Sequence, residues 1–299
     1  MSLELMPAEW PTTILIPVLS ALGAVGGILA KDFFFPLSLE SLKERRALEH
    51  TYRRYKDPLV VSAAELAHRL NEITSRHPVN YLCSKVLDNH PAKQLKNDDT
   101  DPYFMRHKLM STLYRFCSFF GWLELYRQEI TFLNSGNERH AREMEIATNF
   151  IRSDMADGHI NTHTDWIQWR DTLIFREELR AIGEAMIDTT GPTQTVIAYG
   201  KFLQLLDSKT ENATKRWTEV VMNFVLDPET DRDFRKARMD RLLVHLISLI
   251  DLMEPRYVGR RLADAQRRAL ASPYAWPEGP TLPPQPKSMF DAALLSLSA

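Results

Sequence analysis

The chain has 299 residues, of which 25% are charged, and its formal net charge is −2. This balance excludes the strongly basic composition that is typical of a nucleic-acid binder, so no nucleic-acid partner is expected. Cys83 and Cys117 are the only two cysteines, and they form neither a disulfide framework nor a metal-binding spacing. The length suffices for one large helical domain or two small ones.

Residues 13–30 form the most apolar stretch, TILIPVLSALGAVGGILA, which contains 18 residues and no charge. A helix of about this length crosses the hydrocarbon core of a bilayer. A cleaved signal peptide is disfavoured because the first ten residues contain no Lys or Arg and because Ile28 is too bulky for the cleavage site. A buried core helix is disfavoured because the stretch is apolar on all sides. We therefore predict a single transmembrane helix over 13–30.

The charges that flank this stretch predict its orientation. The first ten residues contain Glu4 and Glu9 and no cation, whereas residues 31–56 contain seven cations. The positive-inside rule then places residues 1–12 outside the membrane and the rest of the chain in the cytoplasm. Trp10 is expected to lie at the outer interface as an aromatic anchor.

Two glycines within the stretch, Gly23 and Gly27, form a G-x-x-x-G pattern. Small residues at this spacing allow two helices to approach closely in a membrane. This face is therefore a candidate for homo-oligomerisation, although glycine is also common in spanning helices that do not associate.

Residues 31–57 are predicted to form a basic juxtamembrane segment, with a helix over 38–56 that ends at Asp57-Pro58. Its cations recur at helical spacing and form one stripe, which consists of Lys43, Arg46, His50, Arg53 and Arg54. A basic stripe directly after a spanning helix is placed to contact anionic lipid head groups. The alternative is a solvated helix face with local ion pairs such as Glu49–Arg53.

Residues 58–271 are predicted to form an α-helical cytosolic domain, and the whole cytosolic part to contain about seven to nine helices. Apolar residues recur with helical period over 61–75, 104–133, 137–155, 165–188, 193–207, 214–226, 231–253 and 254–270. Strand alternation is nearly absent, which argues against a Rossmann or barrel enzyme and predicts an all-α class. Gly183 is expected to mark a close helix crossing, and His245 to be a core histidine with a satisfied hydrogen bond.

His159 and His163, with Asp157 nearby, are the best candidates for a metal site. A histidine pair four residues apart binds zinc when it lies on a helix. This pair follows Gly158 in a predicted turn, so a polar turn is the simpler interpretation, and we assign no metal or cofactor. The sequence also lacks a P-loop, G-x-S-x-G and H-E-x-x-H, so we assign no catalytic residue.

Residues 272–299 form a proline-rich tail with a short apolar end. Four prolines recur at every third position, namely Pro277, Pro280, Pro283 and Pro286. This is the period of the polyproline II helix. Such a segment is either a passive, stiff linker or a ligand for the aromatic groove of a protein partner.

These features together predict a single-pass membrane-anchored helical protein. Its expected role is a non-enzymatic interaction or regulatory module at the cytoplasmic membrane face. The expected partners are the lipid bilayer, a second copy of the chain and a protein that binds the tail. The competing hypothesis is a membrane-associated all-α enzyme or effector that acts on lipid or uses a divalent metal.

Overall fold

The computed structural model describes residues 35–75, 79–87, 101–131, 138–156, 172–228, 233–272 and 275–276. The chain divides into two units, Met1–Tyr52 and Arg53–Ala299. In the first unit only the helical backbone of residues 35–52 is described. The predicted span 13–30, with Gly23 and Gly27, and the interface residue Trp10 lie outside the described residues. Among the helices that are described, none is long and apolar enough to cross a membrane.

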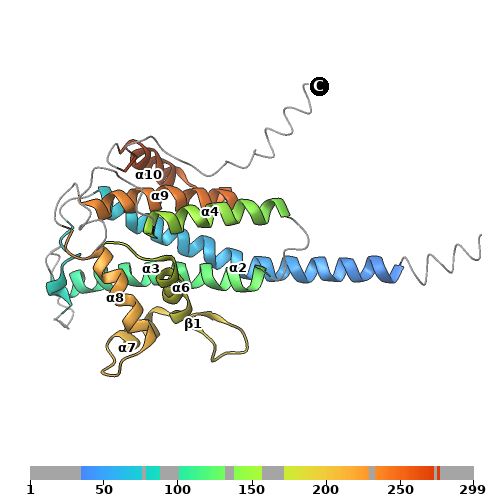
Figure 1. Ribbon diagram of the computed structural model, residues 1–299, viewed down its shortest axis with the longest axis horizontal. Coiled ribbons are helices and arrows are strands. Elements are labelled where there is room, and N and C mark those ends of the chain that lie inside the picture. The colour runs from blue at the N-terminus through green and yellow to red at the C-terminus, as the bar shows by residue number, and fades with distance from the viewer. Residues whose placement is uncertain are drawn as a thin grey trace, which may run out of the picture. The chain divides into compact units, whose positions relative to one another are not determined.

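Eight α-helices and two very short strands lie in the described residues, so the all-α prediction is confirmed (Figure 1). The helices are α2 (Phe35–Ser75), α3 (Pro102–Thr131), α4 (Glu138–Ala156), α6 (Arg176–Ala185), α7 (Tyr199–Leu206), α8 (Ala213–Val225), α9 (Phe234–Met253) and α10 (Arg260–Leu270). Two single-turn 3-10 helices, η2 (Ser84–Val86) and η3 (Pro255–Tyr257), complete the helical elements.

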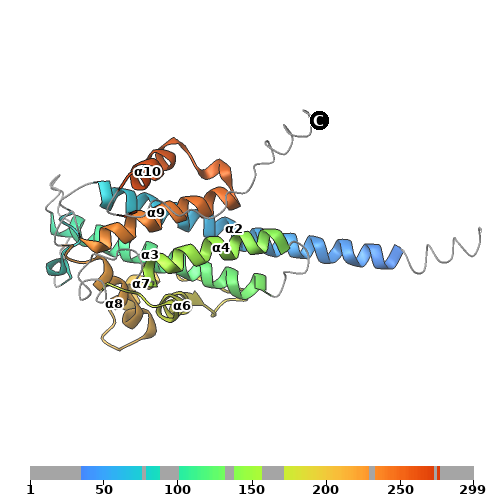
Figure 2. The same ribbon diagram turned by 45° about the horizontal axis from the view of Figure 1, so that its top comes forward.

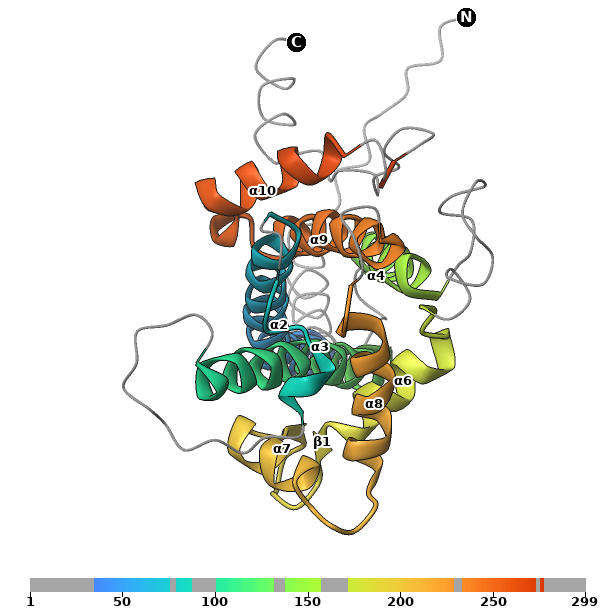
Figure 3. The ribbon, with the colours of Figure 1, turned by 90° about the vertical axis from the view of Figure 1, so that its left-hand side faces the viewer.

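Within the second unit, the helices form two groups. Helix α9 packs against α4 and α10 in one group, while α8 packs against α6 and α7 in the other, and α3 packs against all three helices of this second group (Figures 1 and 3). The two groups meet where α4 contacts α6. The turned view in Figure 2 also shows α4 beside α9. The part of α2 after residue 52 is tied to α3 by an ion pair between Glu72 and Lys108, whose Nζ lies 2.6 Å from Oε1. It is tied to α10 by Arg268, which donates to Thr74 over 2.7 Å.

Helix α2 corrects the predicted break at Asp57-Pro58, because the helix continues through Pro58 to Ser75. A proline inside a helix removes one hydrogen bond and costs about 3 kcal/mol. The neighbouring residues Tyr55 and Leu59 are both buried, and a fully buried Leu contributes about 1.5–3 kcal/mol. Burial on both sides of Pro58 thus offsets the local cost. Ser62 lies inside the helix, where its hydroxyl donates to the Leu59 carbonyl.

The predicted long helix over 165–188 is confirmed over 176–185 and is wrong at both ends of its described part. Residues 172–175 are not helical, and α6 begins only at Arg176. The amide of Ile174 instead donates to the Met155 carbonyl over 3.1 Å, which ties this segment to the end of α4, and the Ile174 side chain is buried. The chain after α6 also differs from the prediction. Strand β1 (Ile187–Asp188) pairs with antiparallel β2 (Thr195–Val196), with Ile187 opposite Val196.

Gly183 confirms the predicted close helix crossing. A Cβ atom at this position would lie 2.6 Å from the Phe120 carbonyl oxygen and 2.9 Å from the Cβ of Glu124. Real side chains do not approach this closely, so α6 reaches α3 only because residue 183 has no side chain.

Candidate functional site

The predicted site residues lie in three places. The metal candidates Asp157, His159 and His163 lie outside the described residues, as do the tail prolines. Of the basic stripe, Lys43 and Arg46 lie in the part of α2 where only the backbone is described. Arg53 and Arg54 are described and exposed. These predictions therefore stay predictions.

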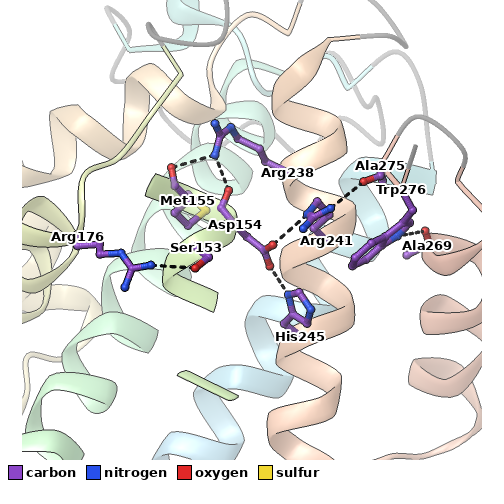
Figure 4. A network of polar contacts seen from close by, with 10 residues as sticks. All are labelled: Ser153, Asp154, Met155, Arg176, Arg238, Arg241, His245, Ala269, Ala275 and Trp276. Carbon is purple, nitrogen blue, oxygen red and sulfur yellow. Dashed lines mark hydrogen bonds and ion pairs between the residues drawn. The ribbon is translucent and has the colours of Figure 1, made fainter. Parts of the chain in front are cut away.

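The most elaborate polar constellation in the described residues is centred on Asp154, in the last turn of α4 (Figure 4). Its side chain is only 1% exposed. One carboxylate oxygen accepts a hydrogen bond from His245 Nδ1, and the other accepts from Arg241 Nε over 3.1 Å. Both partners lie on α9, four residues apart, so they project from one face of that helix. The carboxylate thereby connects α4 with α9 in the core.

Arg238 extends this constellation to the backbone of α4. The last carbonyls of a helix have no partner within the helix and form the negative end of its dipole. Arg238 Nη1 donates to the carbonyls of Asp154 and Met155, with a distance of 3.1 Å to Met155. The Arg238 side chain is fully buried, and the two carbonyls place partial negative charge beside its guanidinium.

The same constellation holds the chain that follows α10. Arg241 Nη1 donates to the Ala275 carbonyl over 3.2 Å, and its guanidinium lies 4.4 Å from the centre of the Trp276 ring. Trp276 Nε1 donates to the Ala269 carbonyl over 3.0 Å, and the Trp276 side chain is buried. A guanidinium over an indole ring and a satisfied indole N–H are both stabilising. The residue directly before Pro277 is therefore fixed in the core.

The geometry of His245 indicates a structural role for this constellation. Its ring is packed between Phe150, at 4.9 Å between ring centres, and Trp276, at 5.7 Å. An acid or base catalyst needs a nitrogen that reaches a substrate, whereas this imidazole is 1% exposed. The prediction of a core histidine with a satisfied hydrogen bond is confirmed.

Sequence reasoning missed the other members of the constellation. Arg238, Arg241 and His245 stand at positions i, i+3 and i+7 and therefore share one face of α9, and this spacing is a usable signal for a polar face. The partner was not readable, because Asp154 lies 91 residues before His245 and its own helix contains many other charges.

Among the described residues, no group of three or more His, Cys, Asp or Glu side chains is arranged to hold a metal ion. No family model, curated protein or solved structure matches this chain. Its function is therefore inferred from its own residues.

Proposed function

We propose that this protein is a membrane-anchored helical interaction module. Residues 13–30 form the anchor with the N-terminus outside, the helical unit from Arg53 onward lies at the cytoplasmic membrane face, and the proline-rich tail binds a protein partner. The proposal combines the apolar N-terminal stretch of the sequence with the way in which the folded unit holds the start of the tail.

The membrane part of the proposal rests on the sequence. An uncharged stretch of 18 residues is followed by a segment with seven cations, and the first ten residues contain none. Within this proposal, the Gly23/Gly27 face associates with a second copy of the anchor. Lys43, Arg46 and the exposed Arg53 contact anionic lipid, together with Arg54.

The observation that supports an interaction role is the burial of Trp276. A passive linker does not need a fixed first residue, yet this tryptophan is held by a guanidinium, a carbonyl and the His245 ring. The repeated prolines begin at the next residue. A polyproline segment is already ordered before binding, so it loses little entropy when it docks in an aromatic groove. A fixed starting point further reduces the conformational entropy that the tail loses when it binds.

Alkaline extraction and protease protection test the anchor. We expect the full chain to stay in the membrane pellet, and a tag before residue 13 to be protected from protease added on the cytoplasmic side. A variant without residues 13–30 is expected to enter the soluble fraction. Recovery of the full chain in the soluble fraction, or cleavage of the N-terminal tag, would overturn the anchor or its orientation.

Binding to a panel of isolated polyproline-binding domains tests the tail. The detergent-solubilised full chain is expected to bind at least one such domain, and replacing Pro280 and Pro283 by Ala is expected to weaken that binding strongly. Pro192→Ala is the matched control, because Pro192 is an exposed proline in the loop between β1 and β2. Equal binding of the wild type and the tail variant would remove the tail from the proposal.

A further inference from the structure

Helices α3, α4 and α6 line a pocket of about 250 Å³ that is partly open to solvent. One part of its lining is apolar and consists of Phe120, Leu123 and Leu179. The other part is charged and consists of Glu124, Arg152, Arg176, Glu177 and Arg180. A cavity of about 150 Å³ is enough to hold benzene, so this one has room for a small organic ligand.

Two of the three arginines have no partner in the described part of the chain. Neither Arg152 nor Arg180 forms a hydrogen bond or an ion pair there, whereas Arg176 donates to Ser153 Oγ over 2.9 Å (Figure 4). Burial lowers the pKa of Arg152. Glu124 opposes this effect, while the guanidiniums of Arg127, Arg180 and Arg176 lower the pKa further. A partly buried cation beside other cations is costly unless an anion neutralises it.

Glu124 is largely occupied and does not fill this role. Its carboxylate accepts hydrogen bonds from Arg127 Nε over 2.8 Å, from Arg127 Nη2 over 2.6 Å and from Gln128 Nε2 over 2.9 Å. Burial raises the pKa of Glu124, but these hydrogen bonds outweigh it and the net pKa lies below its usual value. The second carboxylate of the lining, Glu177, is exposed on α6, as are the Arg176 and Arg180 side chains, so this one carboxylate faces two cations at the rim of the pocket. An excess of positive charge therefore remains around Arg152 and Arg180.

We propose that this cavity binds a phosphate monoester, with the phosphate between Arg152 and Arg180 and the organic substituent against Phe120 and Leu179. Guanidinium groups match the oxygens of a phosphate with two parallel hydrogen bonds, which favours phosphate over a diffuse anion. The apolar part of the lining accommodates a substituent that inorganic phosphate lacks. The site does not depend on the membrane anchor or on the tail. Failure of this proposal therefore leaves the proposed function untouched, and the reverse also holds.

Calorimetric titration of the detergent-solubilised full chain with phenyl phosphate tests the site. We expect saturable binding that is stronger than binding of inorganic phosphate. Arg152→Gln and Arg180→Gln are each expected to weaken it about tenfold or more, because each removes a charge-assisted hydrogen bond. Arg260→Gln is the matched control, since this exposed arginine lies on α10 and faces Asp264. Absence of saturable binding in the millimolar range, or equal affinity of Arg152→Gln and the wild type, would overturn the proposal.

Thermal unfolding supplies a second readout that a merely structural arginine would not give. Without ligand, Arg152→Gln is expected to unfold at a higher temperature than the wild type, because it removes a partly buried cation without a partner. Phenyl phosphate is expected to raise the unfolding temperature of the wild type only. A lower unfolding temperature of ligand-free Arg152→Gln would contradict an anion site.

A competition experiment distinguishes the source of the phosphate. If the natural ligand is a lipid head group, dihexanoyl phosphatidic acid displaces phenyl phosphate from the wild type. If it is a soluble ester, glycerol 3-phosphate displaces phenyl phosphate more effectively than the short-chain lipid does. Displacement by either probe supports the site, and displacement by neither overturns it.

Discussion

Two charged residues that are two positions apart on α4 behave in opposite ways. Successive helical residues are separated by 100°, so Arg152 and Asp154 point to nearly opposite sides of the helix. Asp154 faces α9, where His245 and Arg241 satisfy its carboxylate. Arg152 faces the cavity beside α6 and has no partner in the described residues. Burial alone therefore does not decide the role of a charged side chain. A charge with hydrogen-bonded partners of opposite sign stabilises the fold, whereas a charge without them is available to a ligand.

The largest effect is expected from Asp154→Asn. This change leaves the buried groups of His245 and Arg241 without their carboxylate, and breaking a buried ion pair by removing one partner costs about 3–5 kcal/mol. The free energy of unfolding from urea titrations is the measurement. Glu145→Gln on the exposed side of α4 is the control and is expected to change that free energy by less than about 0.5 kcal/mol. If the two variants are equally stable, the Asp154 constellation does not stabilise the fold.

Gly183→Ala tests whether α6 and α3, which both line the cavity, are in close contact. The added methyl group would lie 2.6 Å from the Phe120 carbonyl oxygen, so α6 has to move away from α3. Overpacking of this kind costs about 1–3 kcal/mol, which exceeds the gain in helix propensity of about 1 kcal/mol. Gly200→Ala in α7 is the control, because nothing lies within 4 Å of its Cβ position, and it is expected to stabilise slightly. A stabilising Gly183→Ala would mean that α6 and α3 are not in close contact.

His68 is a third partly buried group, and its effect is expected in the pH dependence of the free energy of unfolding. Burial lowers the pKa of this imidazole, and the guanidiniums of Arg261 and Arg115 lower it further. Below the unfolded value of about 6.5, the unfolded chain binds a proton that the folded chain does not, so this contribution to stability is lost as the pH falls. We expect His68→Gln to lose less stability than the wild type between pH 7.5 and 5.5 in urea titrations. Identical losses in the two proteins would show that His68 does not contribute.

The two cysteines offer a smaller, local comparison. Burial raises the pKa of Cys117 to about 12, although the Thr218 hydroxyl opposes this shift. Cys83 is partly exposed. Because the thiolate is the reactive form, a thiol reagent is expected to modify Cys83 in the native protein and Cys117 only after unfolding. Rapid native modification of two thiols would show that the interface between α3 and α8 opens readily.

Much of this fold was predictable from the sequence, because helices with one buried face repeat their apolar residues with a fixed period. The apolar residues of the helix predicted over 61–75 include Leu66, Leu70 and Ile73, and all three are buried. The continuation of α2 through Pro58 and the start of α6 were not predictable, because they depend on tertiary contacts. Burial of Tyr55 and Leu59 offsets the local effect of Pro58, and the Ile174 amide donates to the last turn of α4.

The charged sites were less predictable than the helices. The sequence places Arg152 and Arg180 in ordinary amphipathic patterns, and neither residue differs there from a solvated surface arginine. Only the tertiary packing of α3, α4 and α6 places the two arginines at one pocket. The partner of His245 was equally hidden, since a buried ion pair between distant helices has no local sequence signature.

The central claim is that the Asp154 constellation fixes Trp276 and with it the start of the tail. Fluorine NMR of the full chain labelled with 5-fluorotryptophan tests it directly, with Trp276→Phe used to assign the resonance. We predict that the Trp276 signal shows no solvent isotope shift between H₂O and D₂O in the wild type and in Arg152→Gln, and that Asp154→Asn introduces one. A shift in the wild type, or an unchanged signal in Asp154→Asn, would contradict the account.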